Sequence, residues 1–299
     1  MVQIKFGTAG WRAVISDEFT MENVRLVTQA IADYINRQAT SDKKQVVVGY
    51  DTRFMSENFA KVSSRVLAAN GIKALLTIRD VPTPALAYEI LRRRASGGIN
   101  FTASHNPPEY NGIKFSPSWG GPALPETTDA IEKNCALLMR GESSVRDISW
   151  EEGKDRGLIE YVDPRPEYIK RISELVNLEE IKRAKLKVAA DLIYGTGRDY
   201  LDAILKQAGC EVIVLHNWRD VLFGGSPPEP SSAYIGELVK MVKEEKCDLG
   251  LATDGDSDRF GIVDGDGTFI SANQVLALLL NHLVKTRNWK GVVARSVMT

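Results

Sequence analysis

A run of alternating acidic residues is the strongest candidate for chemistry in this sequence. Asp254, Asp256 and Asp258 directly follow an apolar stretch that is typical of a buried strand. Side chains alternate between two faces of extended backbone, so the three carboxylates should point the same way. Like charges at this spacing repel one another unless a cation neutralises them. An all-oxygen ligand set without His or Cys favours Mg²⁺, so the sequence predicts a magnesium loop.

The acidic run has two other possible interpretations. A solvated acidic turn has the same composition, and the residue types alone do not separate the two. An EF-hand calcium loop is excluded, because its sixth position would be Arg259 instead of glycine and its twelfth Gly265 instead of glutamate. Ligands of open α/β sheets bind at the carboxyl ends of strands, which is where this run lies.

A serine after another predicted strand is the second candidate. Ser104 and His105 follow the apolar run that ends at Thr102, and a turn-rich segment begins at Asn106. A hydroxyl at that position can project into a cleft. The motif is not the GxSxG elbow of hydrolases, because Thr102 and Asn106 occupy the glycine positions. Taken alone, Ser104 is more typical of a loop or a helix cap than of a nucleophile, and His105 more typical of a surface or packing histidine.

A glycine pair that follows a third predicted strand partly resembles a nucleotide-binding motif. The dinucleotide fingerprint requires a small residue where Tyr200 stands and an acidic residue near the end of the next strand, where His216 and Asn217 occur. Gly195–Gly197 therefore does not match it. The sequence also contains no GxxxxGK[ST] phosphate-binding loop.

Alternating strand and helix patterns must position these candidates. Gln45–Tyr50 is a β-branched run typical of a buried strand, and the preceding helical periodicity has Thr20 as its predicted N-cap. A second helix is predicted to be capped at Ser56 and to stop at Gly71, and a third to begin at Thr83 before a proline. This alternation predicts a mainly parallel sheet covered by helices.

The same alternation continues along the chain and divides it into segments. Residues 1–150 and 164–266 are each predicted to form an α/β domain, and the charged, weakly periodic segment 151–163 is predicted to link them. A helix over 271–287 and a strand over 291–297 would begin a third domain, 267–299, that is incomplete here. The expected fold class is a series of three-layer α/β/α domains with mostly parallel, mixed sheets.

Composition limits the classes of partner. The chain has 299 residues, of which 43% are hydrophobic, enough for packed cores. Its 38 basic and 39 acidic residues give a net charge of −1, so no global field favours nucleic acid or an anionic membrane. No apolar run approaches the length of a membrane span, and we see no signal peptide. The cysteines are few and form no CxxC pair, which suits free thiols and a cytoplasmic protein (Cys135, Cys210 and Cys247).

Three motifs in this order resemble those of the α-D-phosphohexomutase family, which comprises phosphoglucomutases, phosphomannomutases and their relatives. They are Phe6–Arg12 (FGTAGWR), Thr102–Phe115 (TASHNPPEYNGIKF) and Asp254–Phe260 (DGDSDRF). Gly49–Arg53 also resembles the family's GxDxR strand end, and Gly120–Ala123 resembles a following loop. The likeness covers essentially the whole chain. Two departures are Ala13, where glycine commonly follows the arginine, and Ser257, where glycine or alanine is common.

The resemblance implies four domains in the complete family fold, the first three being related α/β units. This chain resembles domains 1 and 2 and the beginning of domain 3. The family's sugar-recognition loop and distal phosphate-binding loop would lie beyond Thr299. We therefore expect this chain to have no appreciable mutase turnover alone. We also expect the unfinished segment 267–299 either to pack against a neighbouring copy or to be poorly protected in hydrogen exchange.

The resemblance also assigns roles. Ser104 would carry the phosphate and pass it to a sugar monophosphate, giving a bisphosphate that returns its other phosphate to Ser104. Mg²⁺ would be the cofactor and a hexose 1,6-bisphosphate the activator. A phosphoserine adds a charge of about −1.5 to −2, which cations must compensate. The implied set consists of metal ligands (Asp254, Asp256, Asp258 and the phosphorylated Ser104), arginines that bind phosphate oxygens (Arg12 and Arg259) and proton-handling groups (His105 and Lys114). Lys114 could act as a base if the metal and arginines lower its pKa.

The expected function is a phosphohexomutase, most similar to phosphoglucomutase, whose partner is a sugar phosphate. Phosphomannomutase and phosphoglucosamine mutase activities are alternatives. A Mg²⁺-dependent sugar-phosphate phosphohydrolase is a different class, in which inorganic phosphate would be released. A fragment that binds metal but has no turnover is a third.

Overall fold

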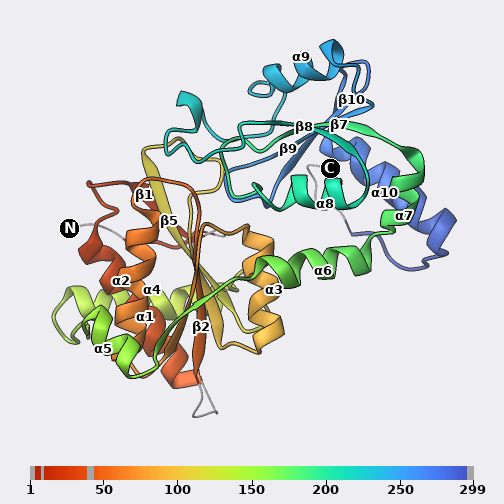
Figure 1. Cartoon of the computed structure of the whole chain (residues 1–299). Helices are drawn as coiled ribbons and strands as arrows, with labels where there is room; N and C mark the ends of the chain where they lie inside the picture. Colours follow the sequence, from red (N-terminus) through yellow and green to blue (C-terminus); the bar gives the residue numbers. More distant parts are fainter. Residues whose placement is uncertain (1–3, 8–9, 39–43, 295–299) are drawn as a thin grey trace.

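Two sheets with helices on their faces make up the chain (Figure 1). The structure is a computed structural model that describes residues 4–7, 10–38 and 44–294. The strand order is β1-β5-β4-β2-β3-β6 in the first sheet and β11-β10-β9-β7-β8 in the second. In each sheet the central pairs are parallel and the strands toward one edge are antiparallel. The predicted class of α/β units with mostly parallel, mixed sheets is confirmed.

The first sheet has helices on both faces. Its strands are β1 (Trp11–Val14), β2 (Gln45–Tyr50), β3 (Lys73–Thr77), β4 (Gly97–Phe101), β5 (Tyr110–Pro117) and β6 (Ile159–Val162). Its helices are α1 (Met21–Gln38), α2 (Ser56–Ala69), α3 (Thr83–Arg93), α4 (Pro125–Met139) and α5 (Trp150–Asp155). Figure 1 shows α1, α2 and α4 on one side of β2 and α3 on the other. Successive β2 side chains point to opposite faces of the sheet, so Val46 and Val48 pack in one hydrophobic core and Val47 packs in the other.

The second sheet is smaller and is arranged in the same way. Its strands are β7 (Lys187–Asp191), β8 (Glu211–Leu215), β9 (Leu249–Thr253), β10 (Phe260–Asp264) and β11 (Phe269–Ile270). Around it and before it lie α6 (Arg165–Leu175), α7 (Leu178–Ala184), α8 (Leu201–Gln207), the short 3₁₀ helix η1 (Phe223–Gly225) and α9 (Gly236–Glu244). Figure 1 shows α9 and α8 on opposite sides of the strands. Buried Leu238 and Val242 of α9 pack against Ala189 and Ala252 of the sheet.

The helix starts follow the sequence signals closely. Thr20 accepts a hydrogen bond from the Asn23 amide at 3.2 Å and caps α1, as predicted. α3 begins at Thr83 as predicted. The predicted Ser56 cap is wrong, because Met55 occupies the cap position and the Ser56 hydroxyl instead donates to Asp51 at 2.9 Å.

The segment 151–163 differs from the expected linker. It contains most of α5, capped by Ser149, and all of β6, which pairs in parallel with β3. Ile159 aligns with Ala74 and Val162 with Thr77, so this segment supplies the edge strand of the first sheet. Its charged residues are those of an edge strand and a surface helix, which explains the weak periodicity.

The C-terminal helix is confirmed and largely exposed. α10 (Ala272–Arg287) begins with a capping box formed by Ser271 and Gln274. In α10 only Val275 is buried. Residues 291–294 of the predicted strand are not in strand conformation, and 295–297 lie outside the described residues. Among the helices that the structure describes, none has both the length and the apolarity needed to cross a bilayer.

Candidate active site

The two strongest sequence candidates follow strand ends of different sheets. β4 ends at Phe101, three residues before Ser104, and β9 ends at Thr253, directly before Asp254. The Ser104 hydroxyl donates to Asp254 Oδ2 at 2.9 Å, and both residues are almost completely buried. The structure therefore brings the predicted phosphate carrier and the predicted metal loop into direct contact across the boundary between the two sheets.

The backbone at Ser104 is held in an uncommon conformation. Its φ is 54°, in the left-handed region that non-glycine residues seldom occupy. The Ser104 amide donates to Thr102 Oγ1 at 2.9 Å, and its carbonyl accepts from Arg53 at 2.7 Å. His105 Nδ1 lies 3.5 Å from the Ser104 hydroxyl. These contacts fix the direction of the hydroxyl, and backbone strain of this kind is common at functional sites.

Arg53 was assigned no role from the sequence, yet it organises the serine loop. Its guanidinium is fully buried and donates to the carbonyl oxygens of Ser104, Asn106, Pro107 and Tyr110 at 2.6–3.0 Å. Asp51 Oδ2 accepts from Arg53 Nε at 3.0 Å. The signal in the sequence was the match of Gly49–Arg53 to a family strand end. That match alone gives Arg53 no role, because its hydrogen-bond partners lie in the serine loop, about 50 residues later.

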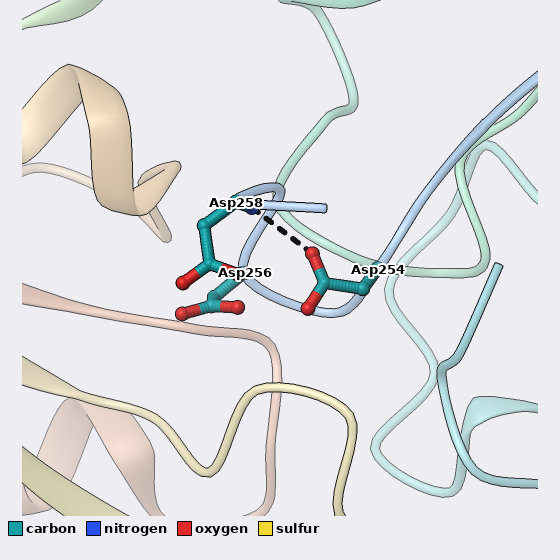
Figure 2. A group of neighbouring side chains, drawn as sticks. All are labelled: Asp254, Asp256 and Asp258. Atoms are coloured by element: carbon teal, nitrogen blue, oxygen red, sulfur yellow. Dashed lines mark hydrogen bonds between the residues drawn. The ribbon is translucent and has the colours of Figure 1, made fainter. Parts of the chain in front are cut away.

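The three carboxylates of the acidic loop are brought together by a turn. The sequence had instead predicted extended backbone, in which alternate side chains share one face. Ser257 has a φ of 56°, and its amide donates to the Asp254 carbonyl at 3.0 Å. The amides of Asp258 and Arg259 both donate to Asp254 Oδ1 at 3.0 Å, and Figure 2 shows Asp256 and Asp258 facing Asp254 across this turn. One oxygen from each of the three carboxylates lies within 4.8 Å of the others.

The donor set suits a divalent cation. Asp254 and Asp256 are fully buried, whereas Asp258 is exposed. Asp256 Oδ1 is buried and has no hydrogen-bond partner, which is costly for a carboxylate oxygen unless something else satisfies it. Three carboxylate oxygens converging at one point are ligands of the kind that Mg²⁺ takes. The residues present therefore fit the implied metal.

Charge repulsion in the loop is visible in its pKa values. Burial, then Asp256 and Asp258, raises the pKa of Asp254 to about 8. Burial alone would also raise the pKa of Asp256, but the charge and hydrogen bond of Lys114 outweigh it and lower that pKa to about 2. A cation held among the three carboxylates would relieve this repulsion.

Lys114 contacts two of these carboxylates. Its Nζ lies 2.6 Å from Asp256 Oδ2 and 3.2 Å from Asp258 Oδ2. Burial lowers its pKa, but Asp256 and Asp258 outweigh burial, so the net shift is upward. This direction is opposite to the lowering expected of a base. In this arrangement Lys114 is an ammonium that neutralises the loop.

The remaining predicted residues gather positive charge around Ser104. Arg12 Nη1 donates to Asn106 Oδ1 at 2.7 Å, which ties β1 to the serine loop. Burial, followed by the charges of Arg259 and Arg12, holds the pKa of His105 below its ordinary value. Arg259 is exposed at the end of the acidic loop. Two guanidinium groups beside a neutral imidazole are suited to an anionic phosphate.

A cleft adjoins the acidic loop and Lys114. Its volume is about 170 Å³. Its walls come from the N-terminal segment, the start of α3, the end of β5, the loop after it, the first turn of α4 and the acidic loop (Phe6, Gly7, Gly10, Thr83, Lys114, Phe115, Ser116, Gly120–Ala123, Thr128 and Asp258). Thr8 and Ala9 of the FGTAGWR motif lie outside the described residues. A small polar ligand in this cleft would reach Lys114 and Asp258 directly.

Two family descriptions and several named proteins resemble this chain over most of its length. Residues 3–138 match the family description "Phosphoglucomutase/phosphomannomutase, alpha/beta/alpha domain I", and residues 166–267 match domain II of the same description. A Methanosphaera stadtmanae protein named "Probable phosphoglucosamine mutase" is 36% identical over 92% of this chain and 58% of its own length. A Thermococcus kodakarensis protein named "Phosphoglucomutase/phosphomannomutase" is 31% identical over 98% of this chain and 62% of its own.

A solved structure has the same arrangement of elements. It is from Thermus thermophilus and is described as that of a "putative phosphomannomutase". It superposes with a TM-score of 0.85 at 32% identity, covering 95% of this chain and 62% of the other. The chain thus spans about three fifths of the length of the relatives it matches.

Proposed function

Because the chain belongs to the phosphoglucomutase/phosphomannomutase family of α-D-phosphohexomutases, we propose that it provides the phosphoserine and metal-binding part of a hexose-phosphate mutase. The observation that supports this most directly is the 2.9 Å contact between Ser104 and Asp254. A buried hydroxyl beside three converging carboxylates supports phosphoryl transfer through a phosphoserine, in which a cation would compensate the charge of the phosphate.

The proposed sugar is glucosamine phosphate. The sequence led us to expect glucose phosphate, on the likeness of the N-terminal motif and the loop at Gly120. The Methanosphaera relative at 36% identity is named as a phosphoglucosamine mutase, and the relative named for glucose and mannose is 31% identical. These names support glucosamine phosphates as the pair of sugar phosphates that is interconverted.

Different residues of the site have different roles in the proposed phosphoryl transfer. The bond between phosphorus and Ser104 Oγ breaks while the sugar hydroxyl oxygen bonds to phosphorus, and the hydroxyl proton ends on Ser104 Oγ. His105 is placed to relay this proton, because its lowered pKa keeps it neutral at pH 7 and it lies 3.5 Å from the serine oxygen. Arg12 and Arg259 bind the phosphate oxygens and hold the group in line.

Asp254, Asp256 and Asp258 would hold Mg²⁺. When bound there, the ion would neutralise charge on the transferring phosphoryl group. Lys114 borders both the acidic loop and the cleft, so its ammonium can bind a sugar hydroxyl or phosphate oxygen in the cleft. Arg53 keeps the serine loop in place throughout, because its bonds are all to backbone carbonyls and Asp51.

Phosphorylation of this chain by a bisphosphate tests the proposal. The chain is incubated with Mg²⁺ and glucosamine 1,6-bisphosphate or glucose 1,6-bisphosphate, and intact mass and peptide mapping follow. We expect one phosphate on Ser104, added faster from the glucosamine compound. A phosphate on another residue, or steady release of inorganic phosphate from sugar phosphates, would contradict it, and the second result would indicate a phosphohydrolase.

A further inference from the structure

The short segment between β3 and α3 connects the two sheets at the active site. Within it, both carboxylate oxygens of Asp80 accept from Arg198 Nη2 at 2.8 Å, and both side chains are nearly buried. Three residues later, the Thr83 hydroxyl donates to Asp256 Oδ2 at 2.6 Å, and the Thr83 amide donates to the Asp256 carbonyl at 2.8 Å. One segment of the first sheet thus holds two loops that belong to the second.

The loop that Arg198 belongs to supports the acidic loop from the other side. The Thr196 amide donates to the Gly255 carbonyl at 3.0 Å, and the Thr196 and Ser257 hydroxyls are 3.0 Å apart. A Cβ atom on Gly195 would lie 2.8 Å from the Gly255 carbonyl oxygen, so only glycine allows this approach. The Gly195–Gly197 sequence, which failed as a nucleotide motif, is here a packing surface for the acidic loop.

The Thr83 hydroxyl acts on one particular carboxylate oxygen. Asp256 Oδ2 accepts from both Thr83 and Lys114, whereas Asp256 Oδ1 is buried and unpartnered. Asn100 Nδ2 donates to Thr83 Oγ1 at 2.8 Å, so the hydroxyl proton is directed at Asp256. With Oδ2 fixed in this way, Oδ1 is the oxygen left for a cation.

We propose that Thr83 is a positioning residue, which sets the orientation of Asp256 and thereby prepares the acidic loop to bind a divalent cation. The inference deepens the proposed function, since it concerns the same cation site. Partners of metal ligands orient them, and their loss typically weakens metal binding about 10-fold or more. The contact also crosses between the sheets, so the same hydroxyl helps to hold the acidic loop beside Ser104.

Matched substitutions separate positioning from bulk stability. Thr83→Val removes the hydroxyl at nearly constant volume, and Thr83→Ser retains it. Thr77→Val is the control, because Thr77 ends β3 in the same sheet and its buried hydroxyl has no partner. Each 299-residue variant is examined for Mg²⁺ affinity by calorimetry, for thermal unfolding, and for hydrogen exchange at the Asp258 and Arg259 amides without added metal.

We expect Thr83→Val to weaken Mg²⁺ binding about 10-fold and to accelerate exchange of those two amides, with β7 remaining protected. Thr83→Ser and Thr77→Val should resemble the unmodified chain. Unchanged Mg²⁺ affinity and unchanged exchange in Thr83→Val would overturn the inference, as would equal losses in Thr77→Val. If the unmodified chain bound no Mg²⁺, the proposed metal function would fail, and exchange without metal would still decide whether Thr83 positions the loop.

Discussion

Ser104 and Asp254 are 150 residues apart in the sequence and follow strands of different sheets, yet the hydroxyl and the carboxylate are joined by a 2.9 Å hydrogen bond. Each side chain therefore obtains this hydrogen-bond partner from the other half of the chain. The candidate site is therefore a product of how the two sheets are held together, and it can be tested by substitutions on either side of that boundary.

Replacing the serine should separate chemistry from folding. Ser104→Ala removes one buried hydrogen bond and leaves Asp254 Oδ2 without its donor, so the free energy of unfolding should fall by about 1–3 kcal/mol. No phosphate should be taken up from a hexose 1,6-bisphosphate, because the hydroxyl that would carry it is absent. Intact mass and thermal unfolding measure the two effects. Uptake near the unmodified level would show that another residue carries the phosphate.

Removing one acidic ligand should weaken metal binding. Asp256→Ala deletes one of three converging carboxylates and leaves Lys114 with Asp258 alone. We expect a marked loss of Mg²⁺ affinity in calorimetric titration. Asp266→Ala is the control, because Asp266 is an acidic residue of a surface turn before β11. Equal affinities in the two variants would place the metal elsewhere.

Arg53 should be essential for stability. Arg53→Met leaves four carbonyl oxygens and the buried Asp51 carboxylate without their donor. Breaking a buried ion pair on one side costs about 3 kcal/mol or more. Denaturant unfolding should show this loss, and the double variant Asp51→Asn, Arg53→Met should recover part of it. A single variant as stable as the unmodified chain would contradict the assigned role.

His216 should make stability depend on pH. Its Nδ1 lies 2.8 Å from Asp191 Oδ1, and that hydrogen bond, opposed by burial and aided by the charges of Asp191 and Glu237, raises the pKa of His216. Because the pKa of His216 is higher in the folded state than in the unfolded state, protonation of His216 stabilises the fold. This stabilisation is complete at a pH below the unfolded-state pKa of about 6.5, and it is lost as the pH rises through the folded-state pKa.

The measurement for His216 is thermal unfolding from about pH 6 to about pH 9. The unmodified chain should lose stability relative to His216→Gln as the pH rises. His282→Gln, at an exposed position of α10, is the control and should follow the unmodified chain. Parallel pH curves for all three proteins would rule out the linkage.

The exposed face of α10 should make this chain associate or leave the helix poorly protected. Its leucines are 42–62% exposed at positions Leu276, Leu278, Leu279 and Leu280. Apolar surface of this extent is usually covered. Sedimentation over a concentration series and hydrogen exchange of α10 test the expectation, with Leu279→Glu as the variant that should reduce association. A monomeric chain with α10 as protected as β2 would contradict it.

Local signals in the sequence predicted local structure well. Thr20 caps α1 and a helix begins at Thr83 as expected, because caps and prolines act on neighbouring backbone. The strand ends that position Ser104 and Asp254 were also predictable, since apolar runs mark buried strands. The charged segment that contains β6 was not, because an edge strand buries little and pairs with a strand 85 residues earlier.

The site residues also fall into two groups, those that local motifs predict and those whose role depends on contacts distant in sequence. Ser104 and the three aspartates lie in motifs of their own, and the resemblance identified them. Arg53 and Thr83 act through contacts with segments distant in sequence, and nothing adjacent to them indicates those partners. The direction of the Lys114 pKa could not be predicted either, since it depends on how close two carboxylates of the other sheet come to its ammonium.

The position of β6 has a consequence for the order of synthesis. The first sheet is complete once Val162 has been made, about 90 residues before Asp254. Domains fold as units during translation, N-terminal first. The hydrogen bonds from Arg53 to the Ser104 loop lie wholly within this first part, so they can form while Asp254 is still untranslated. In this order of synthesis the Ser104 hydroxyl gains its Asp254 partner only when the second sheet forms.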